Sequence, residues 1–162
     1  MERRSALDRL SAGSPRLPSI GRWCAVALLV CNGRYLMQLR DDKPAILLPN
    51  HWALFGGTVD DSEDAAAALR RELVEELELR PRTVVPFTEM TVALPLVPPR
   101  LDRMSFFTVP VNEEDLAATV QHEGAAKRLF DPAALARQKR VAPWDLAAVL
   151  MHARSAELFG PR

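Results

Sequence analysis

The pattern of apolar and polar positions along this chain predicts several strands and one clearly amphipathic helix. The aliphatic run Trp23–Cys31 predicts a buried strand, and the Asn32-Gly33 pair that follows it is the strongest short signal for a tight hairpin turn. We therefore expect residues 34–40 to return antiparallel to the first strand. Further strands are expected at 52–55, running into Gly56-Gly57, and at 83–96 and 103–111, with a turn at Pro98-Pro99 between the last two.

The clearest helical periodicity covers residues 64–77. Leu69, Leu73 and Leu77 recur at intervals of four residues and form one apolar stripe. Ser62 or Asp61 is expected to cap the start of this helix, with acidic residues crowding its first turn, where the helix dipole favours them. Pro81 disfavours helical backbone in the residue before it, so the helix must end ahead of that point. Two later helices are expected. One is capped by Asp131, has Pro132 in its first turn and runs to about Gln138, and the other runs from 143 to about 160.

Strands and helices therefore mix without regular βαβ alternation. The two predicted hairpins favour an α/β fold with a mixed or antiparallel sheet covered by helices. Residues 1–20 combine Arg, Ser, Gly and Pro without sustained periodicity and are interpreted as an N-terminal tail or arm. Residues 21–162 are expected to form a single domain, which the length of 162 residues also favours.

Composition narrows the class of protein. Lys and Arg number 21 and Asp and Glu also number 21, so the formal net charge of +0 argues against stable nucleic-acid binding through bulk positive charge. The longest apolar run is far shorter than the roughly 20 residues of a membrane helix, and no apolar stretch of a secretory signal follows the first arginines. Cys24 and Cys31 lie in one predicted strand and cannot easily form a disulfide. A cytoplasmic protein with no membrane partner is expected.

The overall neutrality hides a strongly acidic segment. Between Thr58 and Glu78 there are eight acidic residues and two arginines, which leaves six uncompensated negative charges. Glu72, Glu75 and Glu76 stand at i, i+3 and i+4, so a helix places all three carboxylates on one edge. A solvated helix face is the plain interpretation of such an edge. Hard divalent cations, however, prefer oxygen ligands of this kind.

The residues around these carboxylates favour the metal interpretation. The segment 57–79, GTVDDSEDAAAALRRELVEELEL, resembles the Nudix box, which is Gly, five residues, Glu, seven residues, Arg-Glu-aliphatic-any-Glu-Glu, one residue, Gly and an aliphatic residue. The second glycine of the box is replaced by Glu78. The positions that match the box are Gly57, Glu63, Arg71, Glu72, Leu73, Glu75, Glu76 and Leu79.

The resemblance implies a fold and a set of residue roles. A Nudix protein is an α/β/α sandwich around a mixed β-sheet. The resemblance implies that Glu72, Glu75 and Glu76 hold Mg²⁺ or Mn²⁺ against a diphosphate, with Glu76 also among the catalytic residues. It gives Glu63 a supporting role near the metal and Arg71 the role of orienting the carboxylates by ion pairing. Gly56 and Gly57 let the chain turn tightly and approach the helix without a Cβ in the way.

Residues outside the box complete the candidate site. Glu123 lies in a Glu-Gly context similar to that of Nudix proteins that hydrolyse deoxynucleoside triphosphates, and it is the candidate general base or further metal ligand; an ordinary exposed loop glutamate is the alternative. Arg40, Trp52 and Arg103 are candidates for binding a base, sugar or phosphate, because guanidinium groups and aromatic faces suit all three. The last helix is expected to cover the sheet and is a candidate homodimer surface.

These observations predict a metal-dependent hydrolase. Its substrate would be a small molecule in which a nucleoside diphosphate is linked to another moiety X, such as a nucleotide sugar, a dinucleotide or a nucleoside triphosphate. A non-catalytic Nudix module that binds a nucleotide or metabolite is the alternative, although such modules usually lose carboxylates that this chain keeps. Isomerisation of an isoprenoid diphosphate is disfavoured, because neither cysteine has an evident partner acid in a motif.

Overall fold

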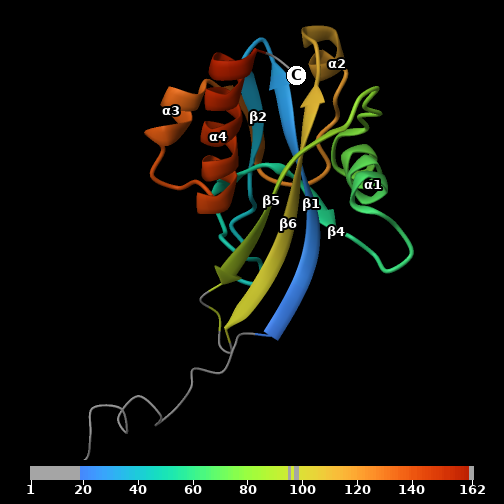
Figure 1. Ribbon diagram of the computed structural model, residues 1–162, viewed down its shortest axis with the longest axis vertical. Helices are drawn as coiled ribbons and strands as arrows, with labels where there is room; N and C mark the ends of the chain where they lie inside the picture. The colour runs from blue at the N-terminus through green and yellow to red at the C-terminus, as the bar shows by residue number, and fades with distance from the viewer. Residues whose placement is uncertain (1–18, 95, 97–98, 161–162) are drawn as a thin grey trace, which may run out of the picture.

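The computed structural model describes residues 19–94, 96 and 99–160 of the chain (Figure 1). Almost all of the predicted N-terminal tail lies outside these residues, as does Pro98 of the predicted Pro98-Pro99 turn. Ser19 and Ile20 already belong to the first strand, so that strand begins earlier than its apolar run. Within the described ranges, no helix combines the length and the apolarity needed to cross a membrane.

A long strand at the centre of the sheet organises the fold. Strand β1 (Ser19–Cys31) forms the predicted hairpin with β2 (Arg34–Leu39), and Asn32 and Gly33 adopt the positive φ angles of 50° and 72° that such a turn requires. On its other side β1 pairs in parallel with β6 (Arg100–Pro110), which in turn pairs antiparallel with β5 (Val85–Leu94). The predicted mixed sheet is therefore confirmed.

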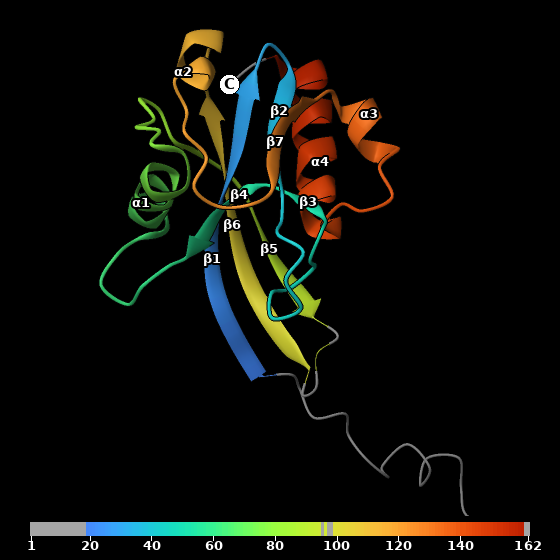
Figure 2. The same ribbon diagram turned by 180° about the vertical axis from the view of Figure 1, so that it is seen from behind.

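Three short strands extend this sheet. The order is β3-β2-β1-β6-β5, with β3 (Trp52–Ala53) beside β2. Strand β4 (Phe55–Thr58) pairs antiparallel with β1, and β7 (Ala126–Phe130) pairs antiparallel with β2 (Figure 2). The predicted strand at 52–55 is thus two strands, and the second of them contains the glycine pair. Strand β7 was not predicted, because its sequence AKRLF shows little alternation.

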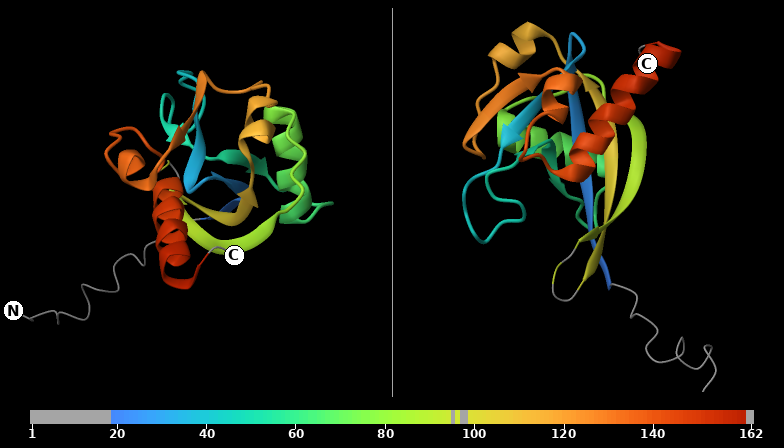
Figure 3. Two further views of the ribbon diagram at one scale, coloured as in Figure 1. Left: turned by 90° about the horizontal axis from the view of Figure 1, so that it is seen from above. Right: turned by 90° about the vertical axis from the view of Figure 1, so that its left-hand side faces the viewer.

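Helices cover both faces of the sheet, as the view from above shows (Figure 3). Helix α1 (Ala65–Leu77) packs on one face, and α4 (Pro143–Phe159) packs on the other. Two short helices, α2 (Glu113–Ala117) and α3 (Pro132–Ala136), follow β6 and β7. Asp131 caps α3 as its sequence predicts, since its side chain accepts a hydrogen bond from the backbone of Ala134 at 2.8 Å.

The start of α1 differs from its prediction. Asp64, rather than Ser62 or Asp61, is the N-cap, and its side chain accepts a hydrogen bond from Ala67 N at 2.8 Å. The first turn therefore contains only alanines, and the acidic residues expected there lie in the loop before the helix. The loop is consequently available to bring an acidic side chain, Glu63, back onto the helix surface.

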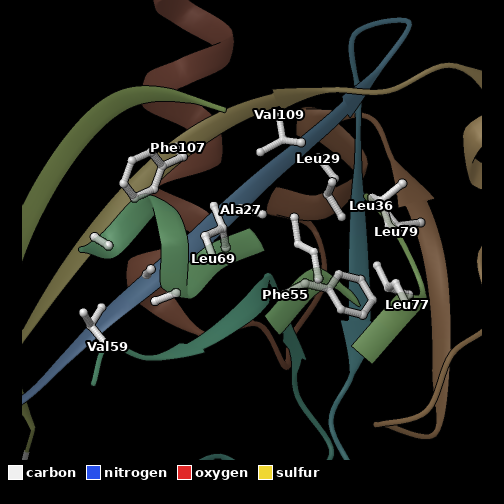
Figure 4. Close-up of a cluster of buried hydrophobic side chains, with 14 residues drawn as sticks. Ala27, Leu29, Leu36, Phe55, Val59, Leu69, Leu77, Leu79, Phe107 and Val109 are labelled. Carbon is white, nitrogen blue, oxygen red and sulfur yellow. The ribbon is translucent and has the colours of Figure 1, made fainter. Parts of the chain in front are cut away.

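Successive side chains of β1 point to opposite faces of the sheet, and this divides the core into two clusters. Residues at odd positions, such as Ala25, Ala27 and Leu29, pack against the leucine stripe of α1 (Figure 4). Residues at even positions, such as Val26 and Leu28, pack against α4. The stripe residues Leu69, Leu73 and Leu77 are fully buried, so the polar edge of α1 is fixed in place relative to β4.

Candidate active site

Arg71 holds together the acidic edge of α1. Its guanidinium donates to Glu63 at 2.6 Å and to Glu72 at 2.7 Å, and it also donates to the carbonyl oxygen of Thr58 at 3.1 Å. Glu75 lies farther out, 3.7 Å from the same guanidinium, with 60% of its side chain exposed. The hydrogen bond to Arg71 lowers the pKa of Glu63. This pairing fixes the loop before α1 against the helix and orients the Glu72 carboxylate.

Strand β4 brings its two glycines directly against the same helix edge. The Gly56 amide donates a hydrogen bond to Glu76 Oε2 at 3.1 Å. A Cβ atom on Gly57 would lie 2.2 Å from the carboxyl carbon of Glu72, so only a glycine leaves room for that carboxylate. Gly56 has a φ of 141°, and a Cβ there would lie 2.1 Å from the Ala25 carbonyl oxygen of β1. The predicted close approach of chain and helix is therefore present at both positions.

Glu76 is a buried carboxyl group with acidic neighbours. Its residue is only 4% exposed, and this burial is the main reason that its pKa is raised well above the usual range of a glutamate. The Glu123 and Glu72 carboxylates lie near enough for their charges to raise that pKa further, whereas the hydrogen bond from Gly56 lowers it. The structure thus brings Glu72, Glu76 and Glu123 together from two distant parts of the chain.

Backbone hydrogen bonds explain how Glu123 reaches this place. His122 N donates to the Glu76 carbonyl oxygen at 2.9 Å, and Val120 N donates to that of Leu77 at 3.1 Å. The loop is therefore tied to the last turn of α1, whose carbonyl groups lack partners within the helix. Glu78 follows that turn with a φ of 55°, the left-handed geometry that suits the glycine it replaces, and its side chain pairs with His122 at 2.7 Å.

A cavity of about 210 Å³ adjoins this cluster on the α4 side of the sheet. Gly56, Gly57 and Thr58 form the wall nearest the carboxylates, so β4 separates the acidic cluster from the cavity. Side chains of β1 and β6, the loop after β2 and the first turn of α4 form the remaining walls; among them are Arg22, Arg40, Arg100, Asp102, Trp144 and Asp145. Among the described residues, the carboxylates of the acidic edge do not themselves line this cavity.

A comparison with protein families decides the classification. The NUDIX domain family matches residues 21–150, which is most of the chain. The chain belongs to the Nudix family. Its box is the glycine, arginine and glutamate arrangement just described, with a glutamate at the second glycine position. Among curated proteins, no sequence matches the chain significantly.

Solved Nudix structures share the fold. A MutT/nudix family protein from Listeria innocua superposes with a TM-score of 0.69 at 23% identity, covering 88% of this chain and 98% of its own. The E. coli dihydroneopterin triphosphate pyrophosphohydrolase gives a TM-score of 0.64 at 19% identity, covering 86% and 100%. The NUDIX domain of Shewanella oneidensis NrtR, in complex with ADP ribose, superposes with a TM-score of 0.63 at 14% identity. That match covers 96% of this chain and 99% of the NrtR domain. The α/β fold around a mixed sheet is therefore shared with both an enzyme and a protein that binds a nucleotide sugar derivative.

Nudix hydrolases generally use divalent metals, and the donor set of this chain fits such an ion chemically. The Glu72 and Glu123 carboxylates act on the buried Glu76 carboxyl group, and carboxylate oxygens are the donors that a hard divalent ion prefers. In the described part of the chain, however, no three acidic, histidine or cysteine side chains stand close enough to form a preassembled metal cluster. Arg71, which pairs with Glu72, fills part of the position beside the carboxylates.

The three residues predicted to bind substrate lie in different places. Arg40 lines the cavity beside the Nudix box. Trp52 packs edge to face on Phe130, with ring centroids 4.9 Å apart, and does not line that cavity. Arg103 pairs with Glu89 at 2.8 Å and stacks over Trp23 on the other face of the sheet. The geometry therefore supports a binding role for Arg40 and does not support one for Trp52 or Arg103.

Asp145 is a residue of this cavity that sequence reasoning missed. Asp145 is 3% exposed, and its Oδ2 accepts a hydrogen bond from Leu54 N at 2.9 Å. Burial raises the pKa of Asp145 to about 7. In the sequence this residue is an acid in the first turn of a helix that begins with proline, a common arrangement with a purely local explanation. Only its position opposite β3 and β4 shows that it faces a cavity.

Proposed function

We propose that this protein is a metal-dependent hydrolase that cleaves the pyrophosphate linkage of a nucleoside diphosphate joined to another moiety. The observation that carries this proposal is the convergence of Glu72, Glu76 and Glu123 beside a cavity large enough for part of a small molecule. The Nudix family membership and the retention of every box carboxylate support it.

Each acidic residue has a distinct task in this proposal. Glu72, Glu75 and Glu76 hold Mg²⁺ or Mn²⁺. Such an ion, when bound, neutralises phosphate oxygens and makes water a better nucleophile at neutral pH. Glu123 accepts the proton of the attacking water or adds a further carboxylate to the ion. Arg71 is a positioning residue, because its hydrogen bonds to Glu63 and Glu72 set where those carboxylates point.

The substrate spans the glycine pair. Its nucleoside lies in the cavity between β4 and α4, and its diphosphate passes over Gly56 and Gly57 to the carboxylates. Arg40, at the cavity wall, contacts the nucleoside or its nearer phosphate. Water then attacks one phosphorus atom, and the bond between that phosphorus and the bridging oxygen breaks. A nucleotide and a phosphorylated X leave, or a nucleoside monophosphate and pyrophosphate when the substrate is a triphosphate.

One screen tests the proposal. Purified full-length protein is incubated with nucleotide sugars, dinucleotides and nucleoside triphosphates, each with Mg²⁺, with Mn²⁺ and with excess chelator, and the products are identified. We expect release of phosphorylated products from at least one class, and loss of that release with chelator. Stoichiometric binding without turnover would instead identify a non-catalytic binding module. A cytoplasmic location and a homodimer formed through α4 stay predictions.

A further inference from the structure

The cavity contains a buried acid with one unsatisfied oxygen. Oδ2 of Asp145 accepts the Leu54 N–H, but within the described residues Oδ1 of Asp145 has no hydrogen-bond partner. A buried polar atom without a partner costs free energy, so native proteins contain few of them. The other buried acid of the cavity, Asp102, differs in this respect, because its two oxygens accept hydrogen bonds from Arg100 and from Arg22 N.

A donor group lies at the same end of the cavity. Nε of Arg40 donates to the carbonyl oxygen of Leu47 at 2.9 Å, which holds the guanidinium at the cavity wall. Its charge lowers the pKa of Asp145, although burial dominates and raises it. The ionised carboxylate is an acceptor only, with Oδ1 open and one lone pair of Oδ2 already used. Asp145 can therefore accept two further hydrogen bonds, and the Arg40 guanidinium is a hydrogen-bond donor in the same cavity.

We infer that Asp145 and Arg40 select a base whose edge presents two adjacent N–H donors followed by a carbonyl acceptor. This edge is the 2-amino-lactam of guanine and of chemically similar bicyclic bases. The two donors would satisfy the Asp145 carboxylate as a bidentate pair, and the carbonyl oxygen would accept from Arg40. The inference deepens the proposed function and rests on it for the expectation that the ligand is a nucleotide.

Other common bases fit this arrangement less well. Hypoxanthine keeps the ring N–H and the carbonyl but lacks the amino group, so one acceptor position of Asp145 stays open. Adenine presents a single donor group next to a ring acceptor, with no carbonyl for Arg40. A site built to accept N–H groups rejects a ligand that lacks them, because its own buried polar groups are then left unpaired.

Binding of monophosphates without divalent metal tests the inference separately from catalysis. Guanosine, inosine and adenosine 5′-monophosphates are titrated into the full-length protein by calorimetry at pH 8, where Asp145 is ionised. We expect guanosine monophosphate to bind about tenfold or more tightly than inosine monophosphate, with adenosine monophosphate weakest. Equal affinities for the three, or no binding of guanosine monophosphate, would overturn the inference.

Two variants and a control locate the cause of the preference. Asp145→Asn is nearly isosteric and replaces an acceptor by a donor, and Asp145→Ala removes the group altogether; both are expected to abolish the guanosine preference. Asp131→Asn makes the same chemical change at the cap of α3, where Asn also caps well, and is expected to keep it. Thermal unfolding confirms that each variant is folded. A preference unchanged in both Asp145 variants would overturn the assignment.

The outcomes also separate this inference from the proposed function. If the protein binds guanosine monophosphate selectively but hydrolyses no diphosphate with Mg²⁺ or Mn²⁺, the base assignment stands and the hydrolase proposal fails. If it hydrolyses guanosine and adenosine substrates with equal kcat/KM and binds the monophosphates equally, the hydrolase proposal stands and the base assignment fails.

Discussion

The amide nitrogen of Gly56 lies 3.1 Å from Oε2 of Glu76, so a backbone group of β4 holds a buried carboxyl group on α1. The two residues are connected by the whole acidic loop and most of the helix. The bond persists because the leucine stripe of α1 fixes the helix against the sheet, and because glycine lets β4 come close. The strand and the helix thereby form one rigid support for the carboxylate cluster.

Replacement of Glu76 by Gln should separate activity from stability. The amide keeps an oxygen that can accept from Gly56 but removes an ionisable carboxyl group that is buried beside acidic neighbours. We expect kcat to fall by about 10²-fold or more, while the free energy of unfolding stays the same or rises. Kinetics with the best substrate of the screen and urea unfolding measure the two effects. Glu114→Gln, on exposed α2, is the matched control, and wild-type turnover in the Glu76 variant would contradict its role.

Replacement of Gly56 and of Gly57 by alanine should have different effects. At Gly57 the added Cβ meets the movable end of Glu72, so Gly57→Ala should displace that carboxylate and lower activity while the protein stays folded. At Gly56 the Cβ meets the backbone of β1 and φ is positive, so Gly56→Ala should cost more than about 2 kcal/mol of stability. Urea unfolding and initial rates measure both variants. A fully active Gly57→Ala protein would show that the position of Glu72 is unimportant.

Restoration of the family's glycine should stabilise the end of α1. Glu78 keeps the left-handed geometry with a φ of 55°, which costs a residue with a side chain roughly 1 kcal/mol. The exposed ion pair between Glu78 and His122 stabilises the protein too little to offset that strain. Glu78→Gly is therefore expected to raise the free energy of unfolding by up to about 1 kcal/mol, and Glu78→Ala, which keeps the strain but loses the pair, is not. A destabilised Glu78→Gly protein would mean that the His122 pair contributes more than the strain costs.

Asp145 should make stability depend on pH in an identifiable window. Its pKa is about 7 in the folded protein and near 3.8 in the unfolded chain, so between these values the folded state binds the extra proton. The contribution of Asp145 to the free energy of unfolding is therefore fully present below about pH 3.8 and is lost as pH rises towards 7. Over that window the free energy of unfolding falls by up to about 1.4 kcal/mol per pH unit. Asp145→Asn should flatten unfolding free energies over pH 4–7 relative to wild type, and Asp131→Asn should not. Parallel profiles for wild type and Asp145→Asn would contradict the raised pKa.

Local signals were enough for much of this fold. The Asn32-Gly33 turn, the leucine stripe of α1 and the Asp131 cap were predicted correctly, because each depends on residues close in sequence. Strand β7 was missed because its short, weakly alternating sequence becomes a strand only by pairing with β2. The predicted N-cap of α1, Ser62 or Asp61, lay two or three residues too early, since Asp61, Ser62 and Asp64 are equally good caps by residue type.

The sequence by itself determined the family-defining pattern, because the spacing of Gly57, Arg71 and Glu76 is a property of one continuous segment. Only the tertiary structure decided which distant residues join that segment. The parallel pairing of β1 with β6 and the docking of α4 place Asp145 opposite β4, and backbone bonds to α1 bring in Glu123. The same pairing puts Arg103 on the face away from the cavity. Such contacts depend on long-range burial and register, which no local pattern in the chain encodes.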